Sequence, residues 1–362
     1  MTQVAIVTRT FDGVVGGVEK MILSLAKGLT AEGHNVTIIS LDLKESKAFF
    51  EWPSGVSWEK LNIGNADFKA SYQIRIRRII AIRKIFKLKK IDAVIGFQIG
   101  SFALARFSAF GLDIHSVAAE RNSPTLFKFI RFGRFKRIIS LLILSSASIV
   151  TVQFENYKKL YPKIIQRRIV VTPNPVTIVS KSVIRRREIT KNLSSVSLLY
   201  VGRFSYQKNV ECLIKAFEML PERFSLTAVG PEAMKFESRI FGAKLHPRII
   251  FLEEMENLEE TYRTHDMFCL PSRFEGFPNV VGEALAHGMP VVGFEECSGI
   301  LELITPGLNG EIADGNDNHK AISEAIIRAS EKEYSRAAVS TSVKEYTFEK
   351  FIKTWTSAIQ YK

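Results

Sequence analysis

The chain contains little cysteine. Only three cysteines occur among its 362 residues, at positions 212, 269 and 297, and no two stand in a Cys-x-x-Cys spacing. This scarcity excludes a disulfide framework and a cysteine-based zinc site. It is consistent with a protein that functions in a reducing compartment.

Long apolar runs are also absent. The longest uncharged stretch, Ile138–Phe154, has 17 residues and is interrupted by four serines. A membrane-spanning helix needs roughly 20 mostly apolar residues. The first apolar run, Val4–Val7, has the length of a strand and is soon followed by Asp12, unlike a signal peptide. We therefore expect neither a spanning segment nor a secretory leader.

Acidic residues are missing from two long segments of the first half. Phe68–Ile91 contains nine basic residues and Arg121–Phe154 contains six, with no acidic residue in either. Residues 1–176 carry a net charge of +15, whereas residues 177–362 carry −2. Such a field attracts an anionic partner, and we expect an anionic membrane surface. The basic side chains expected to contact this surface or an acceptor are Arg75, Arg77, Arg78, Lys87, Lys89, Lys90 and Arg121.

Two other interpretations of this charge exist. It could be only a solvated basic face, because the isoleucines and arginines of residues 74–90 interleave around a helix instead of dividing into two faces. Nucleic acid is not expected as a partner, because no recognisable binding module accompanies the charge. We expect a cytoplasmic protein, bound peripherally to the inner face of the cell membrane.

Strand-length apolar runs alternate with helix-length periodic segments along the chain. Val4–Val7, Val36–Ser40 and Ala93–Gly96 are typical strands, separated by helical patterns. This alternation predicts α/β architecture with parallel, doubly wound sheets. A polar, basic link at residues 181–192 precedes a second series that starts at Leu198. We predict two domains, residues 1–176 and 177–345.

Two carboxylates flank a turn rich in glycine and proline. Glu275 and Glu283 stand on either side of Gly276-Phe277-Pro278, and a helix is predicted to start near Asn279. The first backbone N–H groups of a helix at the carboxyl end of a parallel strand can bind phosphate. A carboxylate beside a phosphate is costly unless it has a separate task, such as accepting hydrogen bonds from sugar hydroxyls. The pattern predicts a nucleotide-sugar site.

This stretch resembles the Glu-x7-Glu signature of the large retaining glycosyltransferase family 4 (glycosyl transferases group 1), which includes many bacterial polysaccharide and lipopolysaccharide enzymes. Other segments resemble that family in the same order along the chain: Gly16-Gly17-Val18-Glu19, Gly33-His34-Asn35-Val36, Pro173-Asn174-Pro175-Val176, Val201-Gly202-Arg203 with Lys208-Asn209, and Gly307-Leu308-Asn309-Gly310. The resemblance implies a GT-B fold, in which two Rossmann-like domains face a cleft. It also implies that the C-terminal helix, residues 346–362, crosses back to the first domain.

The resemblance assigns roles to the motif residues. It implies that Glu275 contacts the hydroxyls of the donor sugar, that Glu283 contacts the ribose, and that Arg203 and Lys208 hold the donor diphosphate. The other residues expected to bind the donor are Gly16, Gly17, Gly276, Phe277, Asn279, Val280 and Val281, the last three through their backbone N–H groups. The alternative is that the acids and cations are ordinary surface groups.

The catalytic element of the first domain departs from the family pattern. Many members have a histidine after the strand that corresponds here to Ser116–Ala119, whereas this chain has Glu120-Arg121-Asn122. We expect Glu120 and Arg121 to bind the acceptor or to stabilise charge during transfer. A salt-linked strand end with no role in catalysis is the alternative.

The activity expected is retaining transfer of a hexose or N-acetylhexosamine from a UDP-sugar to a lipid-linked, lipopolysaccharide-type or capsule-type glycan. No metal or other cofactor is expected, because the chain lacks the Asp-x-Asp pair of metal-dependent transferases and two cations already serve the diphosphate. The rival interpretations are a nucleotide-sugar epimerase of the same architecture and an inactive protein that binds a nucleotide-sugar or a membrane.

Overall fold

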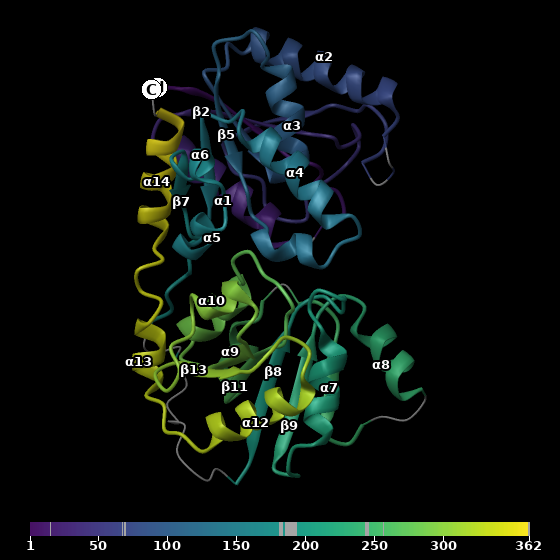
Figure 1. Ribbon diagram of the computed structural model, residues 1–362, viewed down its shortest axis with the longest axis vertical. Coiled ribbons are helices and arrows are strands. Elements are labelled where there is room, and N and C mark those ends of the chain that lie inside the picture. Colours follow the sequence, from purple (N-terminus) through teal and green to yellow (C-terminus); the bar gives the residue numbers. More distant parts are fainter. Residues whose placement is uncertain are drawn as a thin grey trace. The chain divides into compact units, whose positions relative to one another are not determined.

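The computed structural model describes residues 1–360 except residues 15, 67, 69, 181–183, 185–193, 243–245 and 256. The chain divides into two compact units. Unit 1 is Met1–Asn174 together with the chain from Glu349 onward, and unit 2 is Pro175–Phe348 (Figure 1). The division after Asn174 lies two residues before the predicted one. The link predicted at residues 181–192 lies outside the described residues, apart from Ile184.

Unit 1 is built on a seven-stranded parallel sheet with the order β3-β2-β1-β4-β5-β6-β7. Its strands are β1 Gln3–Val7, β2 Asn35–Ser40, β3 Ser57–Lys60, β4 Ala93–Phe97, β5 His115–Ala119, β6 Ile149–Val152 and β7 Ile169–Val171. The central β1 pairs with β2 on one side and β4 on the other, with Val4 opposite both Val36 and Ala93. The central strands are continuous apolar runs because helices cover both faces of a parallel sheet.

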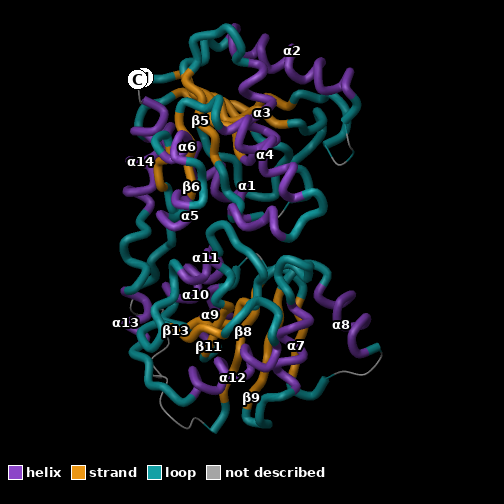
Figure 2. The backbone as a smooth tube through the Cα atoms, viewed as in Figure 1, coloured by secondary structure: helices purple, strands orange, loops and turns teal. Residues whose placement is uncertain are grey.

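Helices flank both faces of this sheet (Figure 2). They are α1 Gly17–Ala31, α2 Tyr72–Leu88, α3 Gln98–Ser108, the 3-10 helix η1 Pro124–Lys128, α4 Gly133–Leu144, α5 Glu155–Lys159, α6 Lys163–Gln166 and α14 Phe348–Gln360. Helices α1 and α14 bury their apolar residues against one face, together with Val4 and Ile6. Helices α2 and α3 pack on the other face, against Ala5 and Val7.

The C-terminal helix α14 belongs to unit 1. Its residues Phe351, Trp355 and Ile359 are buried in the same core cluster as strands β1 and β2. Nε2 of His115, at the start of β5, lies 2.9 Å from the carbonyl oxygen of Ala358. These contacts confirm that the C-terminal helix returns to the first domain.

Unit 2 contains a six-stranded parallel sheet with the order β10-β9-β8-β11-β12-β13. Its strands are β8 Val196–Val201, β9 Phe224–Val229, β10 Ile249–Leu252, β11 Met267–Leu270, β12 Val291–Phe294 and β13 Gly310–Ala313. Its helices are α7 Val210–Glu218, α8 Ala233–Phe241, α9 Glu259–Thr264, α10 Asn279–Ala286, α11 Ser298–Leu301, α12 His319–Ser330 and α13 Arg336–Thr341. The prediction of two doubly wound parallel sheets is confirmed.

Both sheets contain a point at which the direction of strand addition reverses. In unit 1 this point lies between β1 and β4, and in unit 2 between β8 and β11. Ligands of open α/β sheets bind outside the carboxyl ends of the strands at such a point. The loop after β8 and the loop after β11 with the helix α10 that follows it carry most of the predicted donor-binding residues, and they lie at the expected place in unit 2.

Candidate functional site

A cation and a carboxylate join the two loops at this edge of unit 2. Nζ of Lys208, in the loop after β8, lies 2.7 Å from Oε1 of Glu275, in the loop after β11. Both side chains are largely buried, with exposed fractions of 14% and 7%. Nε2 of Gln207 donates to the Phe274 carbonyl at 2.9 Å and to Oε2 of Glu275 at 3.4 Å. The structure thus brings together two of the predicted residues, each expected to contact a different part of the donor.

Arg273 also fastens the loop after β11, a role that sequence reasoning missed. Its backbone N–H donates to the Gln207 carbonyl at 2.9 Å. Its guanidinium lies 2.7 Å from Oδ2 of Asp317 and 4.2 Å from the centre of the Tyr206 ring. Because Arg273 connects its own loop to the loop after β8 and to the segment of Asp317, the position of Glu275 is strongly constrained. In the sequence, the only signal for a role of Arg273 was its position two residues before Glu275.

The loop after β8 is shaped by aromatic packing and by glycine. The buried hydroxyl of Tyr200 donates to the Arg203 carbonyl at 2.9 Å, and the Arg203 side chain is exposed. Burial, followed by the nearby Glu275, raises the pKa of Tyr200 well above its usual value, so the hydroxyl remains a donor. A Cβ at Gly230, after β9, would clash with the Gly202 carbonyl oxygen, so glycine permits the close approach of the two loops.

The second carboxylate, Glu283, lies one turn inside α10, as the sequence predicted. The hydroxyl of Tyr262, on α9, donates to Oε2 of Glu283 at 2.9 Å. The Tyr262 ring stacks on His287 with 5.0 Å between ring centres. Tyr262 is buried, and burial together with Glu283 raises its pKa well above the usual range. Sequence reasoning missed Tyr262, because a single aromatic residue on a short helix before a strand has no distinctive pattern.

The start of α10 corrects one prediction. The N–H groups of Asn279, Val280 and Val281 were all expected to be available to a phosphate. The N–H of Val281 instead donates to the Pro278 carbonyl at 2.9 Å, because the first turn is tightened into 3-10 geometry. Among the described residues, the N–H of Val280 has no hydrogen-bond acceptor.

Gly276 and Phe277 occupy different positions in the same turn. Gly276 is half-buried, whereas the Phe277 ring is buried and meets Tyr346 edge to face at 5.7 Å between ring centres. The aromatic side chain therefore packs within unit 2, and the backbone of this turn is the part that can meet a ligand. Gly16 and Gly17 lie in unit 1, where they form the N-cap and first residue of α1 after strand β1.

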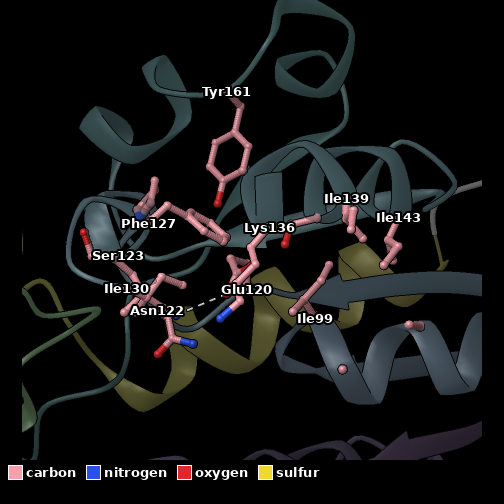
Figure 3. Close-up of a pocket in the computed structure, with 15 residues that line it drawn as sticks. Ile99, Glu120, Asn122, Ser123, Phe127, Ile130, Lys136, Ile139, Ile143 and Tyr161 are labelled. Atoms are coloured by element: carbon pink, nitrogen blue, oxygen red, sulfur yellow. Dashed lines mark hydrogen bonds between the residues drawn. The ribbon is translucent and has the colours of Figure 1, made fainter. Parts of the chain in front are cut away.

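Glu120 follows β5 in unit 1 and points into a largely apolar cavity (Figure 3). Its side chain is 8% exposed, and its Oε1 accepts a hydrogen bond of 3.4 Å from the Asn122 N–H. Burial raises the pKa of Glu120 to about 7, against the opposing effects of the Asn122 N–H and the Arg121 charge. Near neutral pH this carboxyl can therefore hold or release a proton.

Arg121 is not available to an acceptor, contrary to the prediction. It is 5% exposed, and its Nη1 donates to the Thr172 carbonyl at 2.9 Å while its Nη2 donates to the Thr172 hydroxyl at 2.7 Å. Nη2 also donates to the Thr151 hydroxyl, and the guanidinium lies 5.1 Å from the centre of the Trp355 ring. Burial lowers the pKa of Arg121 to about 9. Arg121 joins the ends of three strands to α14.

Two of the predicted membrane-contacting residues are engaged elsewhere. Arg78 is buried, with Nε donating to the Ile63 carbonyl at 2.9 Å and Nη2 to the Gly64 carbonyl at 3.2 Å, so its assignment to an exposed face is wrong. Nζ of Lys89 lies 2.9 Å from Oε1 of Glu59. The remaining four are exposed: Arg75, Arg77, Lys87 and Lys90. Basic residues adjacent in sequence thus divide between buried and exposed positions, which the charge count alone could not reveal.

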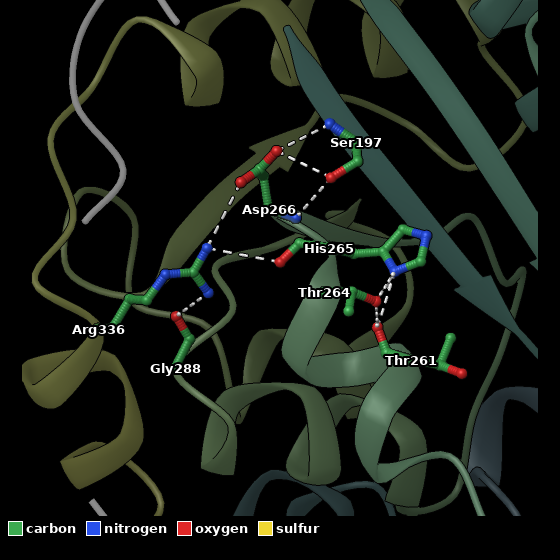
Figure 4. Close-up of polar contacts among 7 residues, drawn as sticks. All are labelled: Ser197, Thr261, Thr264, His265, Asp266, Gly288 and Arg336. Atoms are coloured by element: carbon green, nitrogen blue, oxygen red, sulfur yellow. Dashed lines mark hydrogen bonds and ion pairs between the residues drawn. The ribbon is translucent and has the colours of Figure 1, made fainter. Parts of the chain in front are cut away.

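A buried ion pair holds the opposite edge of the unit 2 sheet (Figure 4). Nη2 of Arg336, which is 1% exposed, lies 3.6 Å from Oδ1 of Asp266 and donates to the His265 carbonyl at 3.4 Å. Oδ2 of Asp266 accepts from the Ser197 N–H at 2.9 Å and from its hydroxyl at 2.8 Å. Because these contacts tie the beginnings of β8 and β11 to α13, they fix the two strands whose other ends carry the site.

Neither a metal cluster nor a membrane span is found in the part of the chain that the structure describes. No group of three or more histidine, cysteine, aspartate or glutamate residues there could hold a metal ion. No described helix combines the length and the apolar character needed to cross a bilayer.

The two doubly wound parallel sheets are those of a GT-B fold. The family described as Glycosyl transferases group 1 matches residues 184–346, and the family described as Glycosyltransferase Family 4 matches residues 15–178. The two matches together span most of the chain, which belongs to the group 1 glycosyltransferases. Glycosyl transfer is therefore its class of activity.

Individual relatives are distant. An uncharacterized glycosyltransferase of Haemophilus influenzae is 22% identical over 95% of this chain and 96% of its own length. A GDP-mannose-dependent alpha-mannosyltransferase of Corynebacterium glutamicum is 31% identical over 41% of this chain and 36% of its own length. The differing names and coverages indicate that the group, rather than one substrate, is shared.

Solved structures share the fold over the whole chain. The lipopolysaccharide outer core galactosyltransferase WaaB is 19% identical, with a TM-score of 0.75 and coverage of 99% of both chains. The Anabaena protein Alr3699/HepE, solved in complex with UDP and glucose, is 14% identical, with a TM-score of 0.76 and coverage of 100% of both chains. At these identities the similarity shows the fold alone.

Proposed function

We propose that the protein transfers a hexose or N-acetylhexosamine, with retention, from a UDP-sugar to a lipid-linked, lipopolysaccharide-type or capsule-type glycan. The observation that carries this proposal is the Lys208–Glu275 pair at 2.7 Å, where the loops after β8 and β11 meet. A cation suits a diphosphate and a carboxylate suits sugar hydroxyls, so the chemistry of the pair fits the junction between the two halves of a nucleotide-sugar. The UDP and glucose complex of the structurally similar Anabaena protein supports UDP as the nucleotide.

Each site residue has a proposed role in this reaction. Arg203, Lys208 and the start of α10 stabilise the negative charge that grows on the departing diphosphate, which then helps to deprotonate the acceptor hydroxyl. Glu275 holds the sugar hydroxyls, and Glu283, oriented by Tyr262, holds the ribose. Gly16 and Gly17 bring the backbone of unit 1 to the donor, and Glu120 serves the acceptor side. The two cations carry out the charge neutralisation without a metal.

We place the protein in the cytoplasm, on the inner face of the membrane, where its acceptor would lie. Four exposed cations, at positions 75, 77, 87 and 90 of unit 1, support attraction to an anionic surface. The fold is shared with WaaB, a galactosyltransferase of the lipopolysaccharide outer core, and this likeness supports a membrane-associated glycan as the acceptor.

A panel of donors tests the proposal. The protein is incubated with UDP-glucose, UDP-galactose, UDP-N-acetylglucosamine or GDP-mannose and a synthetic lipid-pyrophosphate sugar. Extension of the acceptor is measured by mass spectrometry, and the anomeric configuration of the product and any epimer of the donor are identified by proton NMR. We expect one UDP-sugar to yield an extended acceptor with the anomeric configuration retained, also in excess EDTA. Isomerised donor without extension would establish an epimerase, whereas binding without product would establish an inactive protein. Transfer only from GDP-mannose would refute UDP as the nucleotide.

A further inference from the structure

Unit 1 contains a cavity of about 330 Å³ beneath helix α4 (Figure 3). It is bounded by α3, the turn after β5, η1, α4 and Tyr161. Small-molecule sites usually have volumes of about 300–1,000 Å³ and walls that are mostly apolar. The side chains that give this cavity its apolar walls are Ile99, Ala103, Phe127, Ile130, Ile139 and Ile143. Its size and lining are those of a ligand site.

Polar atoms form only a small part of the cavity surface, although six of the fifteen lining residues are polar: Glu120, Asn122, Ser123, the exposed Lys136, Ser140 and Tyr161. Glu120 lies at its base, and burial raises the pKa of its carboxyl to about 7. Burial also raises the pKa of Tyr161 well above its usual value, which keeps the phenol neutral. A sugar ring in this space would leave several hydroxyls without partners, and each costs roughly 1–3 kcal/mol when buried unpaired. The chemistry of the walls instead matches a hydrocarbon chain.

The outer face of the same helix carries a row of exposed apolar side chains. Phe135, Ile138 and Leu142 are 65%, 57% and 66% exposed, at a spacing that places them on one side of α4. The adjacent Arg131 and Arg134 are also exposed. An exposed apolar stripe with cations beside it is the pattern of a helix that lies in the interface of an anionic bilayer. A ligand of the cavity can therefore come directly from the membrane.

We propose that unit 1 binds one hydrocarbon chain of an anionic membrane lipid in the cavity beneath α4, with the outer face of α4 resting on the bilayer. The chain has two possible sources, the lipid carrier of the acceptor or a bulk phospholipid. The first source rests on the proposed transfer to a lipid-linked acceptor, whereas the second does not depend on it.

Photocrosslinking tests both sources. Vesicles of phosphatidylcholine and phosphatidylglycerol are doped either with phosphatidylglycerol bearing a diazirine within one acyl chain or with a short polyprenyl phosphate bearing a diazirine at its apolar end. The labelled residues of the full-length protein are then mapped by mass spectrometry. We expect label on the cavity-lining residues Ile99, Ala103 or Ile143. If the bound chain belongs to the lipid carrier, the prenyl probe should label them. If it belongs to a bulk phospholipid, the acyl probe should label them. Label from neither probe at these residues would overturn the proposal.

Variants that fill the cavity provide the control. Ala103→Trp places a large ring among the walls, and Gly100→Phe adds bulk at a lining position where a new Cβ meets no atom within 4 Å. We expect each to reduce cavity labelling by about tenfold or more, since occupied space excludes the chain. Gly100→Ala, which adds only a methyl group, should retain the label. Undiminished labelling in both larger variants would refute the proposed site.

Calorimetric titration with UDP separates this proposal from the proposed function. Ala103→Trp and Gly100→Phe change residues of α3, none of which is proposed to bind the donor, so both variants should bind UDP as the unaltered protein does. Failure of the unaltered protein to bind UDP would overturn the proposed donor, while cavity labelling would still establish the lipid site. Loss of UDP binding only in the variants would show that they disturb the fold. The proposal would then be judged from which residues are labelled in the unaltered protein and in Gly100→Ala.

Discussion

The loops after β8 and β11 in unit 2 and the turn after β5 in unit 1, each at the carboxyl end of a strand, are built in opposite ways. In unit 2 the loops after β8 and β11 are joined by charged and polar contacts, among them Lys208–Glu275 at 2.7 Å and the hydrogen bond from Nε2 of Gln207 to the Phe274 carbonyl at 2.9 Å. In unit 1 the turn after β5 places Glu120 at the base of an apolar cavity. The net charge also differs, with +15 in residues 1–176 and −2 in residues 177–362.

This difference indicates how the two units recognise their partners. A nucleotide-sugar has fixed phosphates and hydroxyls, and fixed polar side chains suit it because each buried donor or acceptor must find a partner. A partner at a membrane presents hydrocarbon and a diffuse negative charge. Apolar walls can bind the hydrocarbon, and scattered cations are attracted to the charge. We infer that polar geometry carries specificity in unit 2, whereas shape and surface charge carry it in unit 1.

The largest expected effect concerns one buried arginine in each unit, Arg336 in unit 2 and Arg121 in unit 1. Arg336→Met leaves the Asp266 carboxylate buried without its cation, so we expect a loss of about 3–5 kcal/mol in the free energy of unfolding. Arg121→Met removes hydrogen bonds to the hydroxyls of Thr151 and Thr172 and the positive charge beside Glu120. The Glu120 carboxyl can take up a proton, because burial raises its pKa to about 7, and we expect a loss of about 1–3 kcal/mol. Urea denaturation measures both. Equal losses of unfolding free energy in Arg336→Met and Arg121→Met would contradict this difference between the two units. Arg263→Met, which removes an exposed ion pair, is the control and should change stability little.

Removing either donor-site cation should nearly abolish transfer. Arg203→Ala and Lys208→Ala are each expected to lower turnover by at least ~100-fold, because each removes charge stabilisation that grows as the diphosphate departs. Steady-state rates with the best donor provide the measurement. Lys215→Ala, an exposed lysine on α7, is the matched control. Near-normal turnover in both folded variants would refute the assignment.

Glu120 should give unit 1 a pH-dependent stability. Burial raises its pKa from 4.5 to about 7. Between these two pH values the native state therefore keeps a proton on Glu120 that the unfolded chain has released. The stabilisation is complete below pH 4.5 and is lost as the pH rises through about 7, with a total of up to about 3 kcal/mol. Urea titrations at pH 5 and pH 8 should show a smaller difference in Glu120→Gln than in the unaltered protein. The exposed Glu155→Gln should not alter that difference.

The exposed cations of unit 1 should have smaller individual effects. Replacing Arg75, Arg77, Lys87 and Lys90 by glutamine is expected to weaken binding to anionic liposomes by about 1 kcal/mol for each charge, and high salt should do the same. Flotation with phosphatidylglycerol vesicles provides the measurement. The same change in charge in unit 2, at Lys215, Lys235, Arg239 and Lys320, should leave binding unchanged. Equal losses would assign the effect to net charge alone.

The sequence predicted the elements near the donor site well because their signals are local. The apolar run of β11, the proline and glycine of the turn and the helix start at Asn279 all lie within a few residues of one another. The burial of Arg78 and Arg121 could not be predicted, because it depends on carbonyls and hydroxyls supplied by distant segments. The cavity beneath α4 was missed for the same reason, since its walls come from residues 99–161.

The most direct test of the central claim is calorimetric titration of UDP into Glu283→Gln, Glu275→Gln and the unaltered protein. If Glu283 holds the ribose, its substitution weakens UDP binding, and Tyr262→Phe weakens it to a lesser extent. If Glu275 holds the sugar, its substitution leaves UDP affinity unchanged or increased, because it frees Lys208 for the diphosphate, while turnover falls. Equal loss of UDP affinity in both glutamate variants would contradict this division of roles.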